Sequence, residues 1–279
     1  MKRKLVLLPL LVLAVICCYP ILFLLTGSLM DTAELKEYLG PVMQGTEGFV
    51  IWRLFPLYPT LQHYVELLLD SPQFFVMFWN SVLLAAGILS GQLLVGVPAA
   101  WGFARFHFPF RNVLYTIYII LMMMPFQVRM LSDYLILDRL HLLDSHPGII
   151  LPAAFSTFPV FIMYRFFDSV PEAIIESAKL DGAGSLQIFF YIGLPLGAGG
   201  TVSAMVLGFL EYWNLIEQPL TFLKDKTLWP LSLFLPGIGL QKAGIAFVSS
   251  VITLIPAVFV FLLGKDYLEQ GIAAAAVKE

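Results

Sequence analysis

Charged residues are scarce in this sequence. Of its 279 residues, 13% are charged and 59% are hydrophobic, and the mean hydropathy is +0.86. Soluble domains carry about 25% charged and about 45–50% apolar residues, so the charges here are too few to cover a surface that faces water. This shortage excludes an ordinary soluble globular protein and indicates that lipid is the main solvent of the chain.

Cysteine and histidine are also rare. The two cysteines, Cys17 and Cys18, are adjacent inside an apolar run, where they cannot form a disulfide framework or a metal cage. Metal-ligand spacing is missing from the four histidines, His63, His107, His141 and His146. The net charge of −3 gives no indication of a nucleic-acid partner. The composition therefore predicts no metal site and no binding of nucleic acid.

Long apolar segments, in contrast, are abundant. A bilayer core about 30 Å thick is crossed by roughly 20 apolar residues in a helix, and an isolated strand cannot cross it because its backbone groups would stay unpaired. Helix-length apolar segments occur at about 5–28, 74–101, 112–130, 147–167, 193–213 and 243–264. The sequence therefore predicts an all-α integral membrane protein with six transmembrane helices.

Prolines and small residues inside these segments fit the same class. Membrane helices tolerate proline because neighbouring helices re-pair the freed backbone groups, and small residues let helix backbones approach closely. The prolines are Pro20, Pro98, Pro159 and Pro256. The small residues of the fifth segment are Gly197, Ala198, Gly199, Gly200, Ser203, Ala204 and Gly208.

Basic residues beside the spans predict the orientation. Lys2, Arg3 and Lys4 place the N-terminus in the cytoplasm, because cytoplasmic flanks carry the excess of lysine and arginine. Six spans then return the C-terminus to the same side, although the remaining basic residues support this less clearly. The apolar run after Lys4 has no small-residue cleavage site, so we expect a retained first helix and not a signal peptide.

The predicted organisation follows from these spans. Residues 1–29 form the first transmembrane helix, and residues 30–73 form an extracytoplasmic cap loop. Residues 74–264 form a five-helix core that includes a cytoplasmic loop at 168–195. Residues 265–279 form a cytoplasmic C-terminal tail.

The loop at 168–195 is the most informative segment, and it predicts a helix–turn–helix on the inner membrane surface. Asp168 or Ser169 is expected to cap the first helix, Gly182 to end it in a left-handed conformation, and Ser185 to cap the second helix. The apolar positions Val170, Ile174, Ile175 and Ala178 are expected to lie opposite Glu172, Glu176 and Lys179. Amphipathicity alone also fits an ordinary interfacial helix.

The residue series of this loop resembles the EAA loop of ABC importer permeases. In that motif two small residues follow a Glu, a Gly stands six positions after it, and Ile-x-Leu-Pro comes later; Glu176, Ser177, Ala178, Gly182, Ile192, Leu194 and Pro195 match it, with Ser177 in place of the usual Ala. The resemblance implies that the short helix docks on a cytoplasmic ATPase. The residues implied in this coupling are Glu172, Glu176, Ser177, Ala178, Lys179, Asp181, Gly182 and Ala183.

Further motifs resemble the carbohydrate, maltose-permease-like branch of this family and extend the resemblance over nearly the whole chain. They are, in chain order, Asn80-Ser81, Phe103 to Pro109, Pro125-x-Gln127-Val128, Tyr134, Leu151-Pro152, Phe166-Phe167, Trp213-Asn214, Pro219-Leu220 and Gly271 to Lys278. Each motif alone is weak, whereas their order and spacing together are a strong indication.

The resemblance implies a transport subunit and not an enzyme, with several spans in the bacterial cytoplasmic membrane. Its implied partners are a second homologous permease, a cytoplasmic ATPase dimer, an extracytoplasmic solute-binding protein and membrane lipid. Because the sequence has no phosphate-binding G-x-x-x-x-G-K-[ST] loop, ATP and Mg²⁺ are expected on the ATPase. This chain is expected to carry no cofactor and no catalytic residue, and to import a sugar or oligosaccharide.

Polar and aromatic residues near the outer ends of spans two and five are candidates for the substrate pathway. Aromatic faces stack on sugar rings, and amides or carboxylates bond to sugar hydroxyls. The candidates are Asn80, Glu211, Tyr212, Trp213 and Asn214. Aromatic residues at this depth also serve as interfacial anchors, and the partner permease is an alternative carrier of the substrate contacts.

Several alternatives stay open at this point. An ABC permease for a glycerophosphodiester, a polyol or a peptide is one, and the sequence does not identify the solute. A secondary transporter needs intramembrane charges for ion coupling, and Glu211 and Glu217 are the chief ones present. Asp181-Gly182-Ala183 also begins the motif of CDP-alcohol phosphotransferases, a class of membrane enzyme, but the further aspartates of that motif do not follow.

Overall fold

The computed structural model describes residues 2–43, 55–234 and 242–276, and within these ranges it forms helices and no strand. The helices up to residue 168 are α1 (Lys2–Gly27), α2 (Thr32–Met43), α3 (Gln62–Asp70), α4 (Pro72–Arg105), α5 (Arg111–Met122), α6 (Phe126–Arg139), α7 (His146–Ala154) and α8 (Thr157–Asp168). The later ones are α9 (Glu172–Leu180), α10 (Ser185–Ile188), η1 (Phe189–Gly193), α11 (Leu194–Leu196), α12 (Ala198–Trp213), α13 (Glu217–Phe222), η2 (Lys226–Leu228), η3 (Leu231–Leu233) and α14 (Ala243–Ala276).

Four helical segments in the described ranges are long and apolar enough to cross a membrane, at 9–27, 72–105, 146–168 and 243–269. Two further pairs of helices meet the same criterion together, but they bend by 103° between α5 and α6 and by 67° between the α10–α11 segment and α12. With each bent pair counted as one span, all six predicted segments are present. The prediction of an all-α membrane protein is confirmed.

Two predicted boundaries need correction. The third span was expected as one helix through residue 130, but its helix breaks at 123–125, where Pro125 lacks the N–H that would continue the ladder. The last apolar segment was expected at about 243–264, and α14 continues as a helix beyond it to Ala276; the cytoplasmic location of the tail at 265–279 stays a prediction. Residues 235–241 of the outer segment and 277–279 of the tail lie outside the described residues.

The chain divides into two compact units. The first comprises residues 1–76 and 234–256, and the second comprises residues 77–233 and 257–279. The predicted cap loop at 30–73 belongs to the first unit, and its described part folds into α2 and α3.

The first unit has a small core of its own. Phe23 of α1 packs against the buried residues Met30 and Phe247, so α1, the following turn and α14 meet there. The Phe23 and Phe247 rings lie 5.2 Å apart in an edge-to-face arrangement. The hydroxyls of Ser28 and Tyr64 are 2.9 Å apart, and this hydrogen bond connects the end of α1 with α3.

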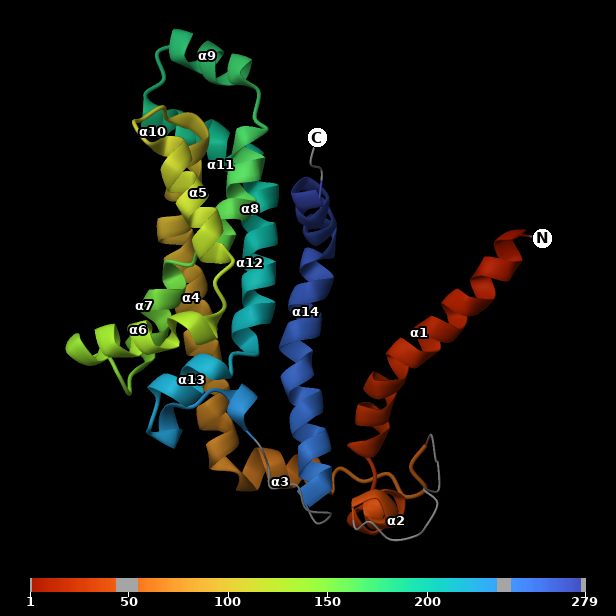
Figure 1. Cartoon of the computed structure of the whole chain (residues 1–279). Helices are drawn as coiled ribbons and strands as arrows, with labels where there is room; N and C mark the ends of the chain where they lie inside the picture. Colours follow the sequence, from red (N-terminus) through yellow and green to blue (C-terminus); the bar gives the residue numbers. More distant parts are fainter. Residues whose placement is uncertain (1, 44–54, 235–241, 277–279) are drawn as a thin grey trace. The chain divides into compact units, whose positions relative to one another are not determined.

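The second unit carries the candidate functional site. Its main core contains Trp101 of α4, Met163 and Phe167 of α8, and Ala204 of α12. Figure 1 shows α9 beyond the ends of α8 and α10, while α6 and α13 lie toward the other end of α12.

Small residues set the close packing of α8 against α12. A Cβ atom added to Gly200 would lie 2.5 Å from the Phe166 ring, and one added to Gly197 would clash with the Phe167 ring in the same way. Because lipid tails are as apolar as these side chains, close contact rather than hydrophobic exclusion stabilises the pair. The predicted role of the small residues in the fifth span is confirmed at these two positions.

Candidate functional site

The loop between α8 and α12 forms a short helix at one end of the second unit. This helix is α9, and it lies beyond the ends of its neighbours (Figure 1). Its buried residue, Ile175, belongs with Val170 to the core that contains Trp101. α9 is therefore anchored by one side and presents its other side to the surroundings.

The start of α9 differs from the prediction. Asp168 is the last residue of α8 and Ser169 is its C-cap, so the expectation that either one caps α9 is wrong. Pro171 occupies the capping position of α9 instead. The reason is local: a proline disfavours the helical conformation at the preceding residue, which places the break between the helices at Val170.

The end of α9 follows the prediction more closely. Gly182 has a φ of 84°, the left-handed conformation in which glycine ends a helix. The expectation that Ser185 caps the second helix is wrong, because Ser185 is already the first residue of α10. The capping contact comes from Gln187, whose Oε1 accepts the Gly184 N–H at 2.8 Å.

α9 exposes apolar side chains beside its charges. Leu180 is 89% exposed and Ile174 is 41% exposed, while Glu176 and Lys179 are exposed around them. Ile174 was expected opposite the charged residues together with Ile175, but only Ile175 of these two is buried in the core. Large exposed apolar side chains among charges are typical of a surface that binds another protein.

Arg105, the last residue of α4, fixes the start of α9. Its guanidinium donates to the Glu172 carboxylate at 3.0 Å and to the main-chain carbonyls of Phe167 and Val170. The Arg105 side chain is 9% exposed, and its guanidinium carbon lies 5.7 Å from the centre of the Trp101 ring. Because a guanidinium presents its donors in a rigid fork, this single residue joins α4, the end of α8 and the first turn of α9.

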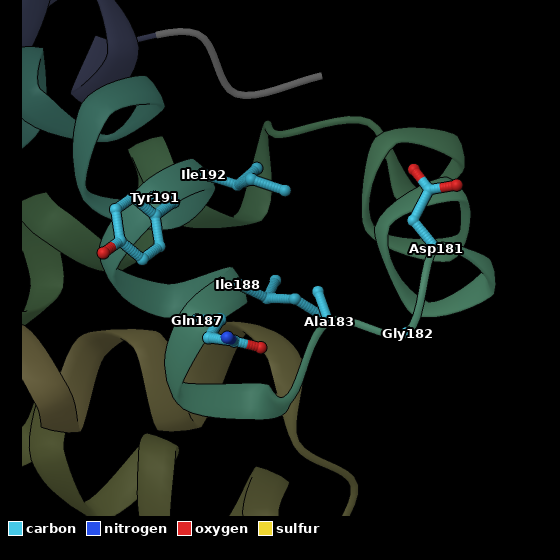
Figure 2. Close-up of a pocket in the computed structure, with 7 residues that line it drawn as sticks. All are labelled: Asp181, Gly182, Ala183, Gln187, Ile188, Tyr191 and Ile192. Carbon is cyan, nitrogen blue, oxygen red and sulfur yellow. The ribbon is translucent and has the colours of Figure 1, made fainter.

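A hollow of about 340 Å³ lies beside the turn that follows α9. Figure 2 shows Ile188 and Ile192 extending from the α10–η1 segment toward this turn, with Ala183 facing Ile188. Asp181 and Gly182 complete the turn side of the hollow. The hollow and the exposed side of α9 together form a continuous candidate docking site.

The candidate pathway residue Asn80 is engaged within the protein. Its Nδ2 donates to the carbonyl of Thr227 at 2.7 Å and to that of Trp229 at 3.0 Å. These bonds fix the loop at 224–229 to α4, far along the helix from Arg105. Asp225 accepts the Thr227 N–H at 2.8 Å, and this bond lowers the pKa of the Asp225 carboxyl.

The other four candidate pathway residues lie at the end of α12. Trp213 is buried between the Phe78 ring, edge to face at 5.8 Å, and the Phe209 ring, stacked at 5.5 Å, and these contacts account for its burial without a ligand. Asn214 is exposed, and its Nδ2 donates to the Leu210 carbonyl at 2.9 Å.

Glu211 and Tyr212 are brought together at a second, smaller cavity of the same unit. The structure thus separates these two residues from Asn80, Trp213 and Asn214. A substrate contact for any of the five stays a prediction. Within the described ranges, no group of three or more His, Cys, Asp or Glu side chains is placed to bind a metal ion.

The arrangement of spans and loop agrees with a known family. Residues 92–274 match the model of the family described as binding-protein-dependent transport system inner membrane component. The chain belongs to this family. This permease is therefore a transport subunit of the inner membrane and works in a system that depends on a binding protein. The predicted resemblance to ABC importer permeases is confirmed.

Curated relatives of this permease are transport subunits with named solutes. It is 28% identical over 270 residues to the arabinooligosaccharides transport system permease protein AraQ of Bacillus subtilis (strain 168). This match covers 95% of this chain and 92% of the relative. It is 29% identical over 218 residues to the sn-glycerol-3-phosphate transport system permease protein UgpE of Yersinia pestis, which covers 73% of this chain and 74% of the relative.

Solved structures share the fold. The permease superposes with a TM-score of 0.81 and 21% identity on a chain of a bacterial ABC transporter involved in the import of the acidic polysaccharide alginate, covering 95% of this chain and 96% of that chain. A bacterial alginate ABC transporter in complex with an alginate pentasaccharide-bound periplasmic protein gives a TM-score of 0.61 at 20% identity, covering 94% and 93%.

Two residues of this site were not singled out from the sequence. Arg105 stands in a motif at the end of a span, where it resembles any other flanking charge. Gln92 is 1% exposed, inside α4, and its Nε2 donates to the Tyr212 hydroxyl at 2.8 Å and to the Ala153 carbonyl at 3.0 Å. A lone amide in the middle of an apolar span is a signal that could have identified it, because such groups need partners in the bundle.

Proposed function

We propose that this permease is one of two membrane-spanning subunits of an ATP-driven importer for a sugar or oligosaccharide, and that α9 is the element moved by a cytoplasmic ATPase. The observation that carries the proposal is the geometry of α9. The helix is held to α4 and α8 through Arg105, and it exposes Leu180 and Ile174 beside a hollow of about 340 Å³. Such an element is both rigidly connected to the spans and open to a partner.

The coupling residues of this proposal are those of the loop. They are Glu172, Glu176, Ser177, Ala178, Lys179, Asp181, Gly182 and Ala183. In this mechanism both termini and the loop lie in the cytoplasm, and the ATPase dimer binds ATP and Mg²⁺. Closure of the dimer presses α9 of this chain toward the corresponding helix of a second permease, which opens the path outward, and hydrolysis reverses the motion. No cofactor and no catalytic group is required of this chain.

The relatives support a sugar as the solute. The relative named for arabinooligosaccharides matches along 95% of this chain, whereas the one named for sn-glycerol 3-phosphate matches along 73%. The second candidate function, import of a glycerol phosphate, rests on that shorter match. An extracytoplasmic binding protein would select the solute and deliver it to the outer side of the two permeases.

Reconstitution of the complete transporter in proteoliposomes tests the proposal. Gly182→Asp and Glu176→Lys are expected to leave ATP hydrolysis in place and to abolish its link to import of an arabinooligosaccharide, because both residues lie at the docking surface. Glu269→Lys, a charge reversal on α14 outside the loop, is the matched control and should import like the wild type. Normal import by a fully assembled Gly182→Asp/Glu176→Lys double variant would overturn the role given to α9, and import of sn-glycerol 3-phosphate alone would favour the second candidate.

A further inference from the structure

A second cavity lies in the same unit, away from α9. It has a volume of about 80 Å³ and lies between α6, α7, α12 and α13. Six of its lining residues are polar or charged: Arg129, Asp133, Ser156, Glu211, Tyr212 and Gln218. Glu211 and Tyr212 were candidates from the sequence, whereas Arg129, Asp133, Ser156 and Gln218 were not.

Three helix breaks meet at this cavity. Phe126, which lines it, is the first residue after the 103° bend between α5 and α6. Ser156 stands between α7 and α8, and Leu215 stands between α12 and α13. Within a membrane, backbone outside a helix is tolerated where it is buried in protein or lines a water-filled cavity, and transporter binding sites are typically built from broken helices. The breaks therefore indicate a cavity on the path of a polar solute.

The charged side chains at the cavity are not engaged in contacts that stabilise the fold. In the part of the chain that the structure describes, the side chains of Arg129, Asp133 and Glu211 form no hydrogen bond and no ion pair. The neighbouring polar pair is different, because Gln127 donates to the Glu217 carboxylate at 2.6 Å and so connects α6 with α13. Arg129 and Glu211 are exposed and Asp133 is half-buried, so these three charges are accessible to a ligand.

The Tyr212 hydroxyl at this cavity is held in position by a buried amide of α4. Tyr212 is 6% exposed, and its oxygen accepts a hydrogen bond from the buried Gln92 amide at 2.8 Å. The same amide donates to the Ala153 carbonyl at 3.0 Å, which fixes its orientation. The Ser156 hydroxyl is a second donor to the Tyr212 oxygen, so the Tyr212 hydroxyl keeps its own proton for another acceptor. The cavity therefore combines free charges with a positioned donor.

The chemistry and size of the cavity define its ligand. Two carboxylates, one amide and one phenol match the hydroxyl groups of a sugar, and a single guanidinium against two carboxylates disfavours an anionic solute. A volume of about 80 Å³ is smaller than the roughly 300–1,000 Å³ of sites that enclose a small molecule. We propose that this cavity is a half-site for the transported solute, which holds the hydroxylated edge of a neutral sugar residue while the second permease completes the site. This inference rests on the proposed function and deepens it.

Occupancy of the half-site can be measured directly by cysteine protection. Ser156→Cys is introduced into the assembled transporter with Cys17→Ser and Cys18→Ser, since both native cysteines are exposed. We expect an arabinooligosaccharide, delivered by its binding protein during ATP turnover, to slow modification of the new thiol by a small methanethiosulfonate reagent about tenfold or more. sn-Glycerol 3-phosphate should give much weaker protection. Asp138→Cys, at an exposed position of α6 that does not line the cavity, is the control whose modification should not change.

Neutralisation of the two acids gives a second, independent readout. Asp133→Asn and Glu211→Gln should each reduce arabinooligosaccharide import about tenfold to hundredfold, the range expected when a hydrogen bond of a charged group is lost, with ATP hydrolysis preserved. Asp138→Asn is the matched control on α6, because Asp138 is exposed and does not line the cavity.

The results that would refute the half-site differ from those that would refute the proposed function. If the wild-type complex imports an arabinooligosaccharide, but neither acid variant differs from Asp138→Asn and no sugar protects Ser156→Cys, the half-site is refuted while the proposed function stands. If the wild-type complex imports no sugar under ATP turnover, the proposed function fails, and the half-site for a neutral sugar fails with it.

Discussion

At the scale of single residues, Arg105 connects three elements of the second unit. It donates to the Phe167 carbonyl in α8, to the Val170 carbonyl between α8 and α9 and to the first residue of α9, and it is almost fully buried. Each hydrogen bond of a charged group contributes about 1.5–3 kcal/mol. Without this residue the carbonyls of Phe167 and Val170 would lose a donor, and the start of α9 would lose its connection to α4.

Substitution of Arg105 is therefore expected to loosen α9 without removing it. Arg105→Ala should lower the amount of sugar imported per ATP hydrolysed, and it should speed proteolytic cleavage between α8 and α9. Arg105→Lys should be intermediate, because an ammonium keeps the charge but lacks the rigid fork. Both effects are measured on the reconstituted transporter.

The control for this prediction is Arg111→Ala. The Arg111 guanidinium makes a longer contact of 3.5 Å, to the Ala104 carbonyl, at the start of α5. An import-to-hydrolysis ratio in Arg105→Ala equal to that in Arg111→Ala would show that Arg105 does not position α9.

Roles of this kind are hard to predict from sequence. Arg105 and Glu172 are separated by 67 positions along the chain, and no local pattern connects them. Gln92 and Tyr212 are separated by 120 positions. Glu211 and Tyr212 were predicted because a sugar needs polar and aromatic groups near the end of a span, and they do line the smaller cavity. Arg129 and Asp133 were not predicted, because the third span was expected to run as one helix to about residue 130.

At the scale of elements, the crossing of α8 and α12 depends on the absence of a side chain at Gly200. An added Cβ would lie 2.5 Å from the Phe166 ring. Overpacking of a close-packed contact costs typically about 1–3 kcal/mol. Gly200→Val should therefore lower the midpoint of thermal unfolding of the solubilised permease by several degrees.

Ala198→Val is the matched control for that substitution. Ala198 is exposed at the first residue of α12, so a larger side chain there should leave the unfolding midpoint close to that of the wild type. Equal unfolding midpoints for the two variants would contradict this prediction. They would mean that α8 and α12 separate to accept the valine at no measurable cost in the free energy of unfolding, so that close packing does not stabilise the pair.

The existence of the helices was predictable, and their bends were not. Apolar length alone identified each membrane segment, because a bilayer requires about 20 residues in a helix. The 103° bend after α5 depends on contacts that α6 makes with α13, which comes much later in the chain. These include the Phe126 and Phe222 rings, whose centres are 5.8 Å apart, and the Gln127–Glu217 hydrogen bond. Pro125 marks the position of the break but does not set its angle.

At the scale of the whole molecule, the orientation in the membrane is the next quantity to measure. Positive-inside flanks predict that α9 is cytoplasmic and that the loop at 224–229 is external. In a Cys17→Ser/Cys18→Ser background, Lys226→Cys should react with a membrane-impermeant maleimide in right-side-out vesicles. Ser177→Cys on α9 should react only after the vesicles are permeabilised. Both positions are exposed, so accessibility depends on the side of the membrane.

The reverse labelling pattern would invert the topology and place α9 out of reach of a cytoplasmic ATPase. Fold class and family could be predicted from composition, from the residue series of the loop at 168–195 and from the further motifs along the chain, because each of these is a local pattern. The placement of the loop against α4 and the smaller cavity required the tertiary structure.

The two attachments of α4 have a mechanical consequence. At the C-terminal end of α4, Arg105 binds the start of α9. Nearer the N-terminal end of α4, Asn80 binds the loop at 224–229. The two residues are about 38 Å apart along the axis, from a rise of about 1.5 Å per residue. Because α4 is a continuous helix that is attached at both points, it acts as a lever. A tilt imposed at the Arg105 attachment displaces the Asn80 attachment. A force applied to α9 on one side of the bilayer then moves the loop at 224–229 on the opposite side through rigid-body motion of α4, without unwinding of the helix.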